Sequence, residues 1–150
     1  MTAHQAALEA LTRYFGYDSF RPGQQGIVEA LLAGRDVLGV MPTGAGKSVC
    51  YQIPAALSPG MTLVISPLIS LMRDQVDALN DLGLPAAFIN TTQTPDEQAM
   101  VFAQAAAGQI KLLYVAPERL ETGRFRDFAA RTPISLIAVD EAHCVSQWGQ

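Results

Sequence analysis

Long apolar runs are missing from this 150-residue chain, and their absence excludes a membrane-spanning helix. No run approaches the roughly 18 consecutive apolar residues that a membrane-spanning helix needs. The N-terminus, MTAHQAALEALTRYFGY, has no basic start followed by an apolar core, so it does not have the pattern of a secretory signal. We therefore expect a cytoplasmic protein with no membrane partner.

Cysteine, histidine and basic residues are also scarce. Cys50 and Cys144 stand far apart in no CxxC pair, and only His4 and His143 could join them at a metal, so we expect two buried, reduced thiols. The formal net charge is −4, from 14 acidic and 10 basic residues. This balance argues mildly against a nucleic-acid partner, because phosphate binding needs Lys and Arg. The balance does not exclude such a partner, because a protein that binds nucleic acid and must release it again needs only a local basic path.

The apolar pattern predicts alternating helices and strands. Leu8, Leu11 and Phe15 form the stripe of a first helix that Gly16 ends. Thr94 is the expected N-cap of a later helix, with Pro95 at the first helical position and Glu97 three residues after the cap. The other predicted helices cover 24–32, a segment from near Gly46, and 70–82, and the capped one runs over 95–107. The predicted strands cover 37–41, 62–66, 86–89, 110–116 and 135–140.

This alternation predicts an α/β fold. Strands that are apolar throughout and alternate with helices form a parallel sheet with helices on both faces. Ligands of such sheets bind beyond the carboxyl ends of the strands. Residues 1–150 have the length of one domain, with no internal repeat, linker or low-complexity segment.

The segment VLGVMPTGAGKSVCYQI has the order strand, glycine-rich turn, helix start. Its glycines let backbone N–H groups point at phosphate oxygens, and the helix N-terminus adds favourable partial charge. Lys47 would reach the β- and γ-phosphates of a nucleotide, and Ser48 would bind Mg²⁺. Met41 stands where the strict pattern asks for Gly, and the alternative is a plain turn with a solvated lysine. The predicted phosphate-binding residues are Thr43, Gly44, Ala45, Gly46, Lys47 and Ser48.

Two adjacent carboxylates end the last predicted strand, in SLIAVDEAH. A strand end beside a phosphate loop is where Mg²⁺ is held and water is positioned. Asp140 is therefore the candidate Mg²⁺ ligand, and Glu141 is the candidate base or water-orienting group. The alternative is a pair of acids that cap a strand in solvent.

Several strings resemble a known family. DEAH, at 140–143, resembles the second motif of superfamily-two helicases, and MPTGAGKS resembles their first motif, which does not require an opening Gly. FGYDSFRPGQQ (15–25), SPLISLMRDQV (66–76), YVAPERL (114–120) and DEAHCVSQWG (140–149) resemble RecQ-type DNA helicases. The resemblance covers nearly the whole chain. It implies a RecA-like P-loop NTPase domain of an ATP-dependent, 3′-to-5′ DNA helicase that acts in repair and recombination.

The resemblance also implies roles at the nucleotide. Gln24 matches the glutamine that reads the adenine edge, since an amide both donates and accepts. Tyr17 and Arg21 match residues that pack on the base; the alternative is a surface aromatic beside a solvated charge. His143 matches the residue that couples the nucleotide site to the DNA site.

Further positions match family segments that touch DNA. Ser66, Pro67 and Leu68 match one backbone-contacting segment, and Arg119 matches another; without the resemblance they would be ordinary strand-end turns. Trp148 would open an aromatic-rich loop that stacks on unpaired bases. The alternative for Trp148 is core packing, but its polar, flexible neighbours favour an exposed loop. Asn90 to Thr94 also fits the family pattern, with no role assigned.

The resemblance finally implies a second RecA-like lobe that completes the ATP site with an arginine. Residues 1–150 then form a first lobe that is incomplete at its C-terminal end. We expect the chain alone to bind ATP and Mg²⁺, to hydrolyse ATP very slowly and to unwind nothing. Two alternatives stay open: a non-catalytic nucleotide-binding or DNA-docking module, and an RNA helicase, against which CVSQWG argues.

Overall fold

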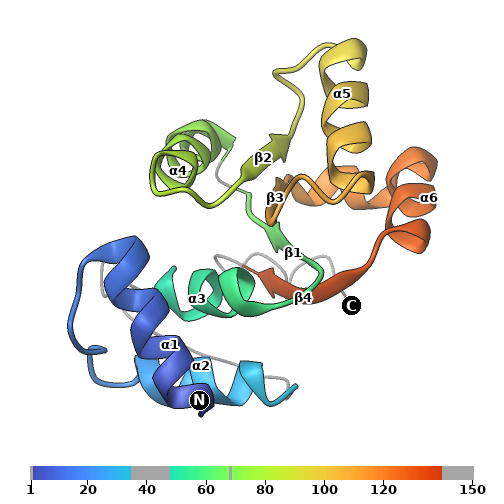
Figure 1. The fold of residues 1–150 in the computed structure, drawn as a ribbon. Helices are drawn as coiled ribbons and strands as arrows, with labels where there is room; N and C mark the ends of the chain where they lie inside the picture. Colours follow the sequence, from blue (N-terminus) through green and yellow to red (C-terminus); the bar gives the residue numbers. More distant parts are fainter. Residues whose placement is uncertain (1, 35–47, 68, 140–150) are drawn as a thin grey trace. The chain divides into compact units, whose positions relative to one another are not determined.

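The computed structural model describes residues 2–34, 48–67 and 69–139, which form two units at residues 1–59 and 60–150 (Figure 1). The strand predicted at 37–41 lies outside the described residues. Within the described part of the chain, no helix is both long and apolar enough to cross a membrane.

The first unit begins with helix α1, Ala3–Ala10, which continues as one π-helical segment, Leu11–Phe15. Thr2 caps α1: its hydroxyl accepts from the Gln5 N–H, and the Gln5 side chain accepts from the Thr2 N–H. Gly16 ends the segment with a φ of 74°, a conformation that costs other residues strain. The helix predicted around Leu8, Leu11 and Phe15 is confirmed, together with its end.

Helices α2, Gln24–Leu32, and α3, Val49–Leu57, are the other helices in the described part of this unit. The predicted bounds of α2 are confirmed. The helix predicted from near Gly46 is described from Val49 onward. Apolar side chains of all three helices share one core, because each helix has an apolar face that only its neighbours can cover. The buried members are Ala7, Ala10, Leu11, Val28, Val49 and Ile53.

In the described residues, the second unit is built on a sheet of four parallel strands in the order β2-β3-β1-β4. This sheet confirms the predicted parallel α/β class. The strands are β1, Met61–Ile65, β2, Ala86–Ile89, β3, Leu112–Val115, and β4, Ile134–Val139.

The helices of this unit are α4, Ile69–Asp81, α5, Pro95–Ala106, and α6, Gly123–Arg131, with a 3₁₀ turn η2 at Pro117–Glu121. Thr94 caps α5 as predicted: its hydroxyl accepts from the Glu97 N–H, and Glu97 accepts from the Thr94 N–H. The α4 bounds differ from the prediction by one residue at each end. Neither η2 nor α6 was predicted from the apolar pattern.

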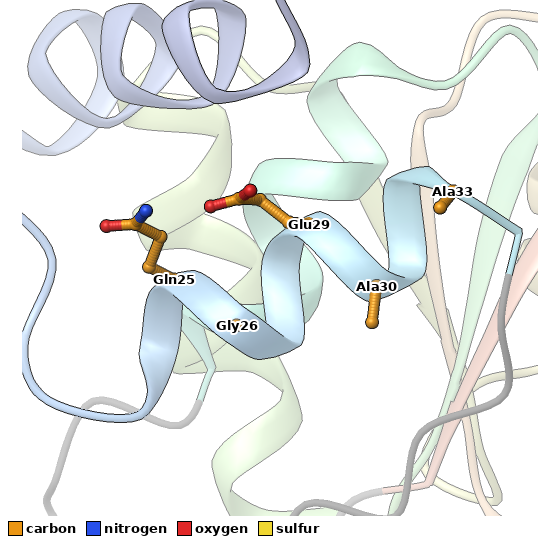
Figure 2. A pocket seen from close by; sticks show the side chains of 5 residues that line it. All are labelled: Gln25, Gly26, Glu29, Ala30 and Ala33. Carbon is orange, nitrogen blue, oxygen red and sulfur yellow. The ribbon is translucent and has the colours of Figure 1, made fainter.

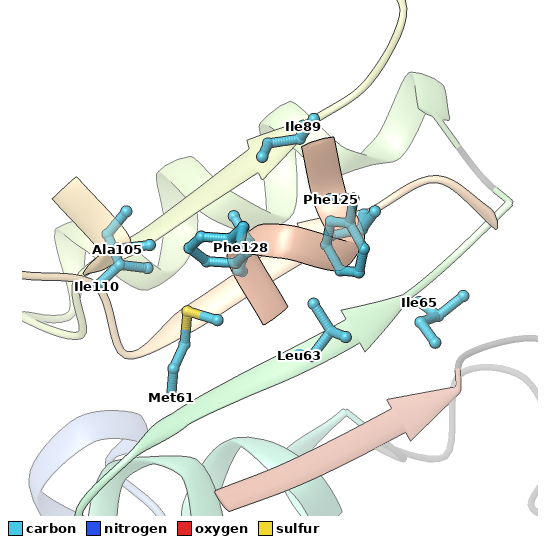
Figure 3. Packing of buried hydrophobic residues seen from close by; sticks show 10 residues of the cluster. Met61, Leu63, Ile65, Ile89, Ala105, Ile110, Phe125 and Phe128 are labelled. Atoms are coloured by element: carbon cyan, nitrogen blue, oxygen red, sulfur yellow. The ribbon is translucent and has the colours of Figure 1, made fainter. Parts of the chain in front are cut away.

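Helices cover both faces of the sheet. On one face, Phe125 and Phe128 of α6 point at the strands (Figure 3). Helix α4 packs on the opposite face. The guanidinium carbon of Arg73, in α4, lies 5.9 Å from the centre of the Phe88 ring of β2. The buried core of the first face is Met61, Leu63, Ile65, Ile89, Ala105, Ile110, Leu113, Val115, Phe125 and Phe128.

The bounds of three strands differ from the predictions. β1 begins and ends one residue before the predicted 62–66. β3 is shorter than the predicted 110–116, because the N–H groups of Lys111 and Leu112 both donate to the Pro85 carbonyl, which interrupts regular pairing there. β4 begins at Ile134, one residue before the predicted strand. Its register shifts after Ile134, so Leu136 rather than Ser135 pairs with Thr62.

Candidate functional site

The segment predicted to hold adenine lies in the first unit, between Gly16 and the start of α2. Tyr17 directly follows the left-handed Gly16 and is 53% exposed. Its carbonyl accepts a hydrogen bond from the Thr12 hydroxyl over 2.9 Å, which fixes the backbone where the chain leaves the helix. An exposed ring on a fixed backbone suits stacking against a planar ligand.

Arg21 and Gln24 are joined by two hydrogen bonds. The Arg21 N–H donates to Gln24 Oε1 over 2.8 Å, and the Gln24 N–H donates to the Arg21 carbonyl over 3.0 Å. Gly23 makes this turn possible with a φ of 88°. Gln24 is 4% exposed while Arg21 is exposed, so the amide is held in one orientation at the first position of α2.

Ser48 is the described part of the predicted phosphate and magnesium site. It lies directly before α3, and its carbonyl accepts from the Gln52 N–H over 2.9 Å. The Ser48 hydroxyl makes no capping hydrogen bond to the helix. An oxygen in this place has the donor chemistry that Mg²⁺ prefers, so the residue fits the predicted ligand.

The helix after Ser48 carries a buried thiol. Cys50 is 6% exposed and is not in a disulfide, which confirms the prediction of a buried, reduced cysteine at this position. Burial raises the pKa of the Cys50 thiol, and a backbone hydrogen bond opposes this in part. The thiol is therefore protonated and unreactive near neutral pH.

An open groove of about 450 Å³ runs along the outer side of α2 (Figure 2). Small side chains one turn apart leave the space, and Gln25 and Glu29 border it (Figure 2). Glu29 lies 3.5 Å from His4 Nδ1. None of the predicted site residues lines the groove, whose full lining is Gln25, Gly26, Glu29, Ala30 and Ala33.

In the second unit, Ser66 and Pro67 follow the carboxyl end of β1. Ser66 is 2% exposed, and its N–H donates to the Val115 carbonyl of β3 over 3.1 Å. The Pro67 carbonyl accepts from the Ile69 N–H over 3.0 Å, which leads the chain directly into α4. The described part of the predicted contact segment, Ser66 and Pro67, is therefore a fixed strand end.

Arg119 lies in η2, directly beyond the carboxyl end of β3. Its N–H donates to the Ala116 carbonyl over 3.0 Å, and its carbonyl accepts from the Thr122 hydroxyl over 2.9 Å. The side chain is half-buried, and its Nε is buried with no hydrogen-bond partner in the described structure. Since β1 and β3 are neighbours, the structure brings the Ser66 and Arg119 segments to the same edge of the sheet.

The remaining predicted residues lie outside the described residues. They are Thr43, Gly44, Ala45, Gly46, Lys47, Leu68, Asp140, Glu141, His143 and Trp148. Asp140 directly follows β4, whose last residue, Val139, pairs with Ile65 at the carboxyl end of β1. Within the described ranges no three acidic, histidine or cysteine side chains gather as a metal site would require.

The match to known protein families decides the assignment. The family model for DEAD/DEAH box helicases matches residues 21–150. The chain belongs to the DEAD/DEAH box helicase family. Within it, the chain is 53% identical to the ATP-dependent DNA helicase RecQ of Haemophilus influenzae over 143 residues, and 48% identical to that of Bacillus subtilis over 144 residues. Each match covers 95% of this chain but only 23% and 24% of those relatives, so the chain spans about a quarter of their length.

Solved helicase structures share the fold. The helicase MrfA, bound to DNA and AMPPNP, matches 96% of this chain with a TM-score of 0.75 at 21% identity, and the match covers 22% of that chain. A hypothetical ATP-dependent RNA helicase from Sulfolobus tokodaii matches 97% with a TM-score of 0.70 at 23% identity, and the match covers 43% of that chain. These likenesses confirm the RecA-like helicase fold of this family member.

One group of residues to which the sequence assigned no role is extensively hydrogen-bonded. Asn90, at the carboxyl end of β2, is 2% exposed, and its Oδ1 accepts from the Thr92 N–H over 2.9 Å. Gln98 of α5 donates to the Asn90 carbonyl over 2.9 Å. The signal in the sequence was the polar run NTTQT directly after an apolar strand, which alone does not distinguish an ordered loop from a solvated one.

Proposed function

We propose that this chain is the ATP-binding lobe of a RecQ-type DNA helicase that couples ATP hydrolysis to 3′-to-5′ unwinding in DNA repair and recombination. The observation that carries the proposal is the hydrogen-bonded pair of Arg21 and Gln24, in a chain of the DEAD/DEAH box family. The Gln24 side chain is held in one orientation at the start of α2, and an amide can both donate to and accept from a base edge. The exposed ring of Tyr17 supplies a stacking surface in the same segment.

The nucleotide is ATP, bound with Mg²⁺. Lys47 and the backbone of Thr43 to Gly46 would hold the phosphates, and Ser48 and Asp140 would hold the metal ion. Mg²⁺ at that place would neutralise charge on the phosphate oxygens. The hydroxyl of Ser48, which does not cap α3, supports this assignment.

Hydrolysis needs a water aligned with the terminal phosphate. Glu141 orients this water and accepts its proton as the new phosphorus–oxygen bond forms and the bond to the bridging oxygen breaks, so that ADP leaves. Lys47 stabilises the charge on the transferred group. An arginine from a second RecA-like lobe stabilises the opposite side, and His143 links this site to the bound strand.

The DNA strand lies along the carboxyl edge of the sheet. Ser66, Pro67 and Leu68 contact its backbone from the end of β1, and Arg119 contacts it from η2. The support is that β1 and β3 are neighbours, with Ser66 bonded directly to Val115. Trp148 stacks on an unpaired base.

The test is a titration of a fluorescent ATP analogue into the 150-residue chain and its Lys47→Ala variant. Removal of a cation that meets two phosphates costs about 1.5–3 kcal/mol per charged hydrogen bond, so the affinity falls by roughly ten- to a hundredfold. Lys111→Ala removes the chain's other lysine and keeps the wild-type affinity. Equal affinity in wild type and Lys47→Ala contradicts the nucleotide assignment.

A further inference from the structure

The segment that leads from the first helix into α2 is held at three points. At its beginning, the Thr12 hydroxyl donates to the Tyr17 carbonyl over 2.9 Å. In its middle, Phe20 packs against the core of the first unit. At its end, the Arg21 N–H donates to Gln24 Oε1. The backbone of this segment therefore follows a defined course, although most of its side chains are exposed.

Thr12 makes two of the hydrogen bonds that direct the chain out of the helix. Its carbonyl accepts from the Gly16 N–H over 3.0 Å, and its hydroxyl donates to the carbonyl of the next residue, Tyr17. These bonds hold the peptide group before Gly16 and the peptide group after Tyr17. The direction of the Tyr17 Cα–Cβ bond depends on the backbone on both sides of it, so Thr12 sets where the ring begins.

The Thr12 hydroxyl bonds in an unusual direction for a helical residue. A threonine inside a helix commonly donates its hydroxyl back to a carbonyl of the preceding turn. Thr12 instead donates forward, to a residue beyond the end of the helix. The turn in which it lies, Leu11–Phe15, is π-helical, a rare form that occurs frequently at functional sites. Since Thr12 is exposed while its neighbour Leu11 is buried, its hydroxyl holds the outgoing chain and takes no part in the core.

This arrangement leaves the ring of Tyr17 open. Tyr17 is 53% exposed, and among the described residues its ring takes part in no aromatic or cation–π contact. A planar base can therefore stack on it without displacing another side chain. Because the backbone beneath the ring is already held, less conformational freedom is lost when a ligand binds, and the affinity is higher for that reason.

We propose that Thr12 is a positioning residue for nucleotide binding, whose hydroxyl holds the Tyr17 backbone so that the ring stacks on the base. The inference rests on the proposed function, in which Tyr17 lies in the segment that holds adenine. Thr12 acts through Tyr17 and does not touch the nucleotide. It therefore affects the part of the affinity that the base contributes and leaves the binding of the phosphates unchanged.

The test compares two ligands of the full-length gene product, each measured with Mg²⁺ by competition against a fluorescent ATP analogue. One is ATP, and the other is inorganic tripolyphosphate, which has the phosphates but no base. Thr12→Val keeps the shape of the side chain and removes the hydroxyl, so the affinity for ATP falls roughly two- to tenfold, the effect of one hydrogen bond. The affinity for tripolyphosphate stays the same. Thr12→Ser, which keeps the hydroxyl, retains the wild-type affinity for both ligands.

Further variants separate positioning from a general loss of stability. Thr12→Ala removes the same hydroxyl but favours the helix, and it gives the same result as Thr12→Val. The matched control is Ser58→Ala, which removes a hydroxyl that donates to the Pro54 carbonyl over 2.7 Å at the end of α3, and which changes neither affinity. In a Tyr17→Ala background, Thr12→Val has no further effect on ATP affinity, because the ring that it positions is gone.

The outcomes distinguish this inference from the proposed function. If the wild type binds ATP and Thr12→Val binds it equally well, Thr12 is not a positioning residue, while the proposed function stands. The same holds if Thr12→Val weakens ATP and tripolyphosphate alike, or if its effect persists in the Tyr17→Ala background. A wild type that binds tripolyphosphate as tightly as ATP gains nothing from the base and overturns the inference. A wild type that binds no ATP overturns both proposals.

Discussion

Gly60 and Ser135 are hydrogen-bonded across 75 positions of sequence: the Gly60 N–H donates to the Ser135 hydroxyl over 2.8 Å. The next N–H, of Met61, donates to the Pro133 carbonyl over 3.0 Å. These two bonds fasten the beginning of β1 to the beginning of β4 and set the register at the shift after Ile134. The carboxyl ends of both strands, where the predicted site residues lie, depend on this register.

Gly60→Ala is expected to destabilise the second unit. A Cβ at this position would lie 2.6 Å from Ser135 Oγ and 3.0 Å from the Pro133 carbonyl oxygen. One of these groups must shift, at a cost of about 1–3 kcal/mol in the free energy of unfolding. Denaturant unfolding measures the change. Gly123→Ala is the control, since nothing lies within 4 Å of its Cβ; equal stability of the two variants would contradict the fastening role.

Gln24→Ala is expected to reduce the preference for ATP over GTP. The Gln24 amide is held by the Arg21 N–H, and an amide placed for the adenine edge leaves unpaired groups against guanine. One such hydrogen bond changes the affinity ratio by about two- to tenfold. Competition between the two nucleotides for the fluorescent analogue measures it.

The neighbouring glutamine supplies the control for this prediction. Gln25 is exposed on the groove of α2, so Gln25→Ala keeps the wild-type preference. Thermal unfolding of both variants checks that the loss at buried Gln24 is not a loss of fold. A wild type that binds GTP as well as ATP would mean that Gln24 does not read the base.

Cys50 is expected to react slowly with thiol reagents in the folded chain. Burial raises its pKa, so its thiolate forms only above the ordinary pH range of a cysteine. The associated stability is fully present below the unfolded pKa and is lost as pH rises through the raised folded value. In a Cys144→Ser background, the labelling rate should keep rising with pH after an exposed cysteine has levelled off. Labelling as fast as in denaturant would contradict the burial.

Helix and strand ends that depend on neighbouring residues in the sequence were predictable from the sequence. The bounds of α2 and β2 were predicted correctly, because Gly23 and Gly34 frame α2 and Pro85 directly precedes β2. The cap of α5 follows from Thr94 and Glu97 alone. In α6, by contrast, only Phe125 and Phe128 are buried on an otherwise polar helix, and their partners on the sheet are distant in sequence.

The residues of the candidate site likewise fall into those that the sequence alone predicts and those that it does not. The phosphate and acidic motifs follow from residue chemistry, whereas Gln24 was assigned through the family resemblance. A glutamine at a helix start has no local signal of burial, and its bond to the Arg21 N–H depends on the turn at Gly23. The order of the strand ends along the carboxyl edge depends on pairings that sequence spacing does not specify.

The ATPase activity of the 150-residue chain alone should differ from that of the full-length gene product. The chain alone should bind ATP but hydrolyse it slowly, because an arginine supplied by a second lobe contributes about 10³–10⁵ in rate in related phosphoryl-transfer enzymes. Single-stranded DNA should not stimulate it. Rapid DNA-stimulated turnover by this chain alone would mean that another residue or a second copy completes the site.

The most direct test is the steady-state ATPase rate of the full-length gene product with single-stranded DNA, with single-stranded RNA and without either. If the full-length protein is an ATP-driven DNA helicase, DNA should stimulate the ATPase rate strongly and RNA should not. Glu141→Gln should lower the stimulated rate by about 10²–10⁴, as expected for loss of a catalytic base. Turnover that ignores DNA, that RNA stimulates equally, or that survives Glu141→Gln would contradict the account.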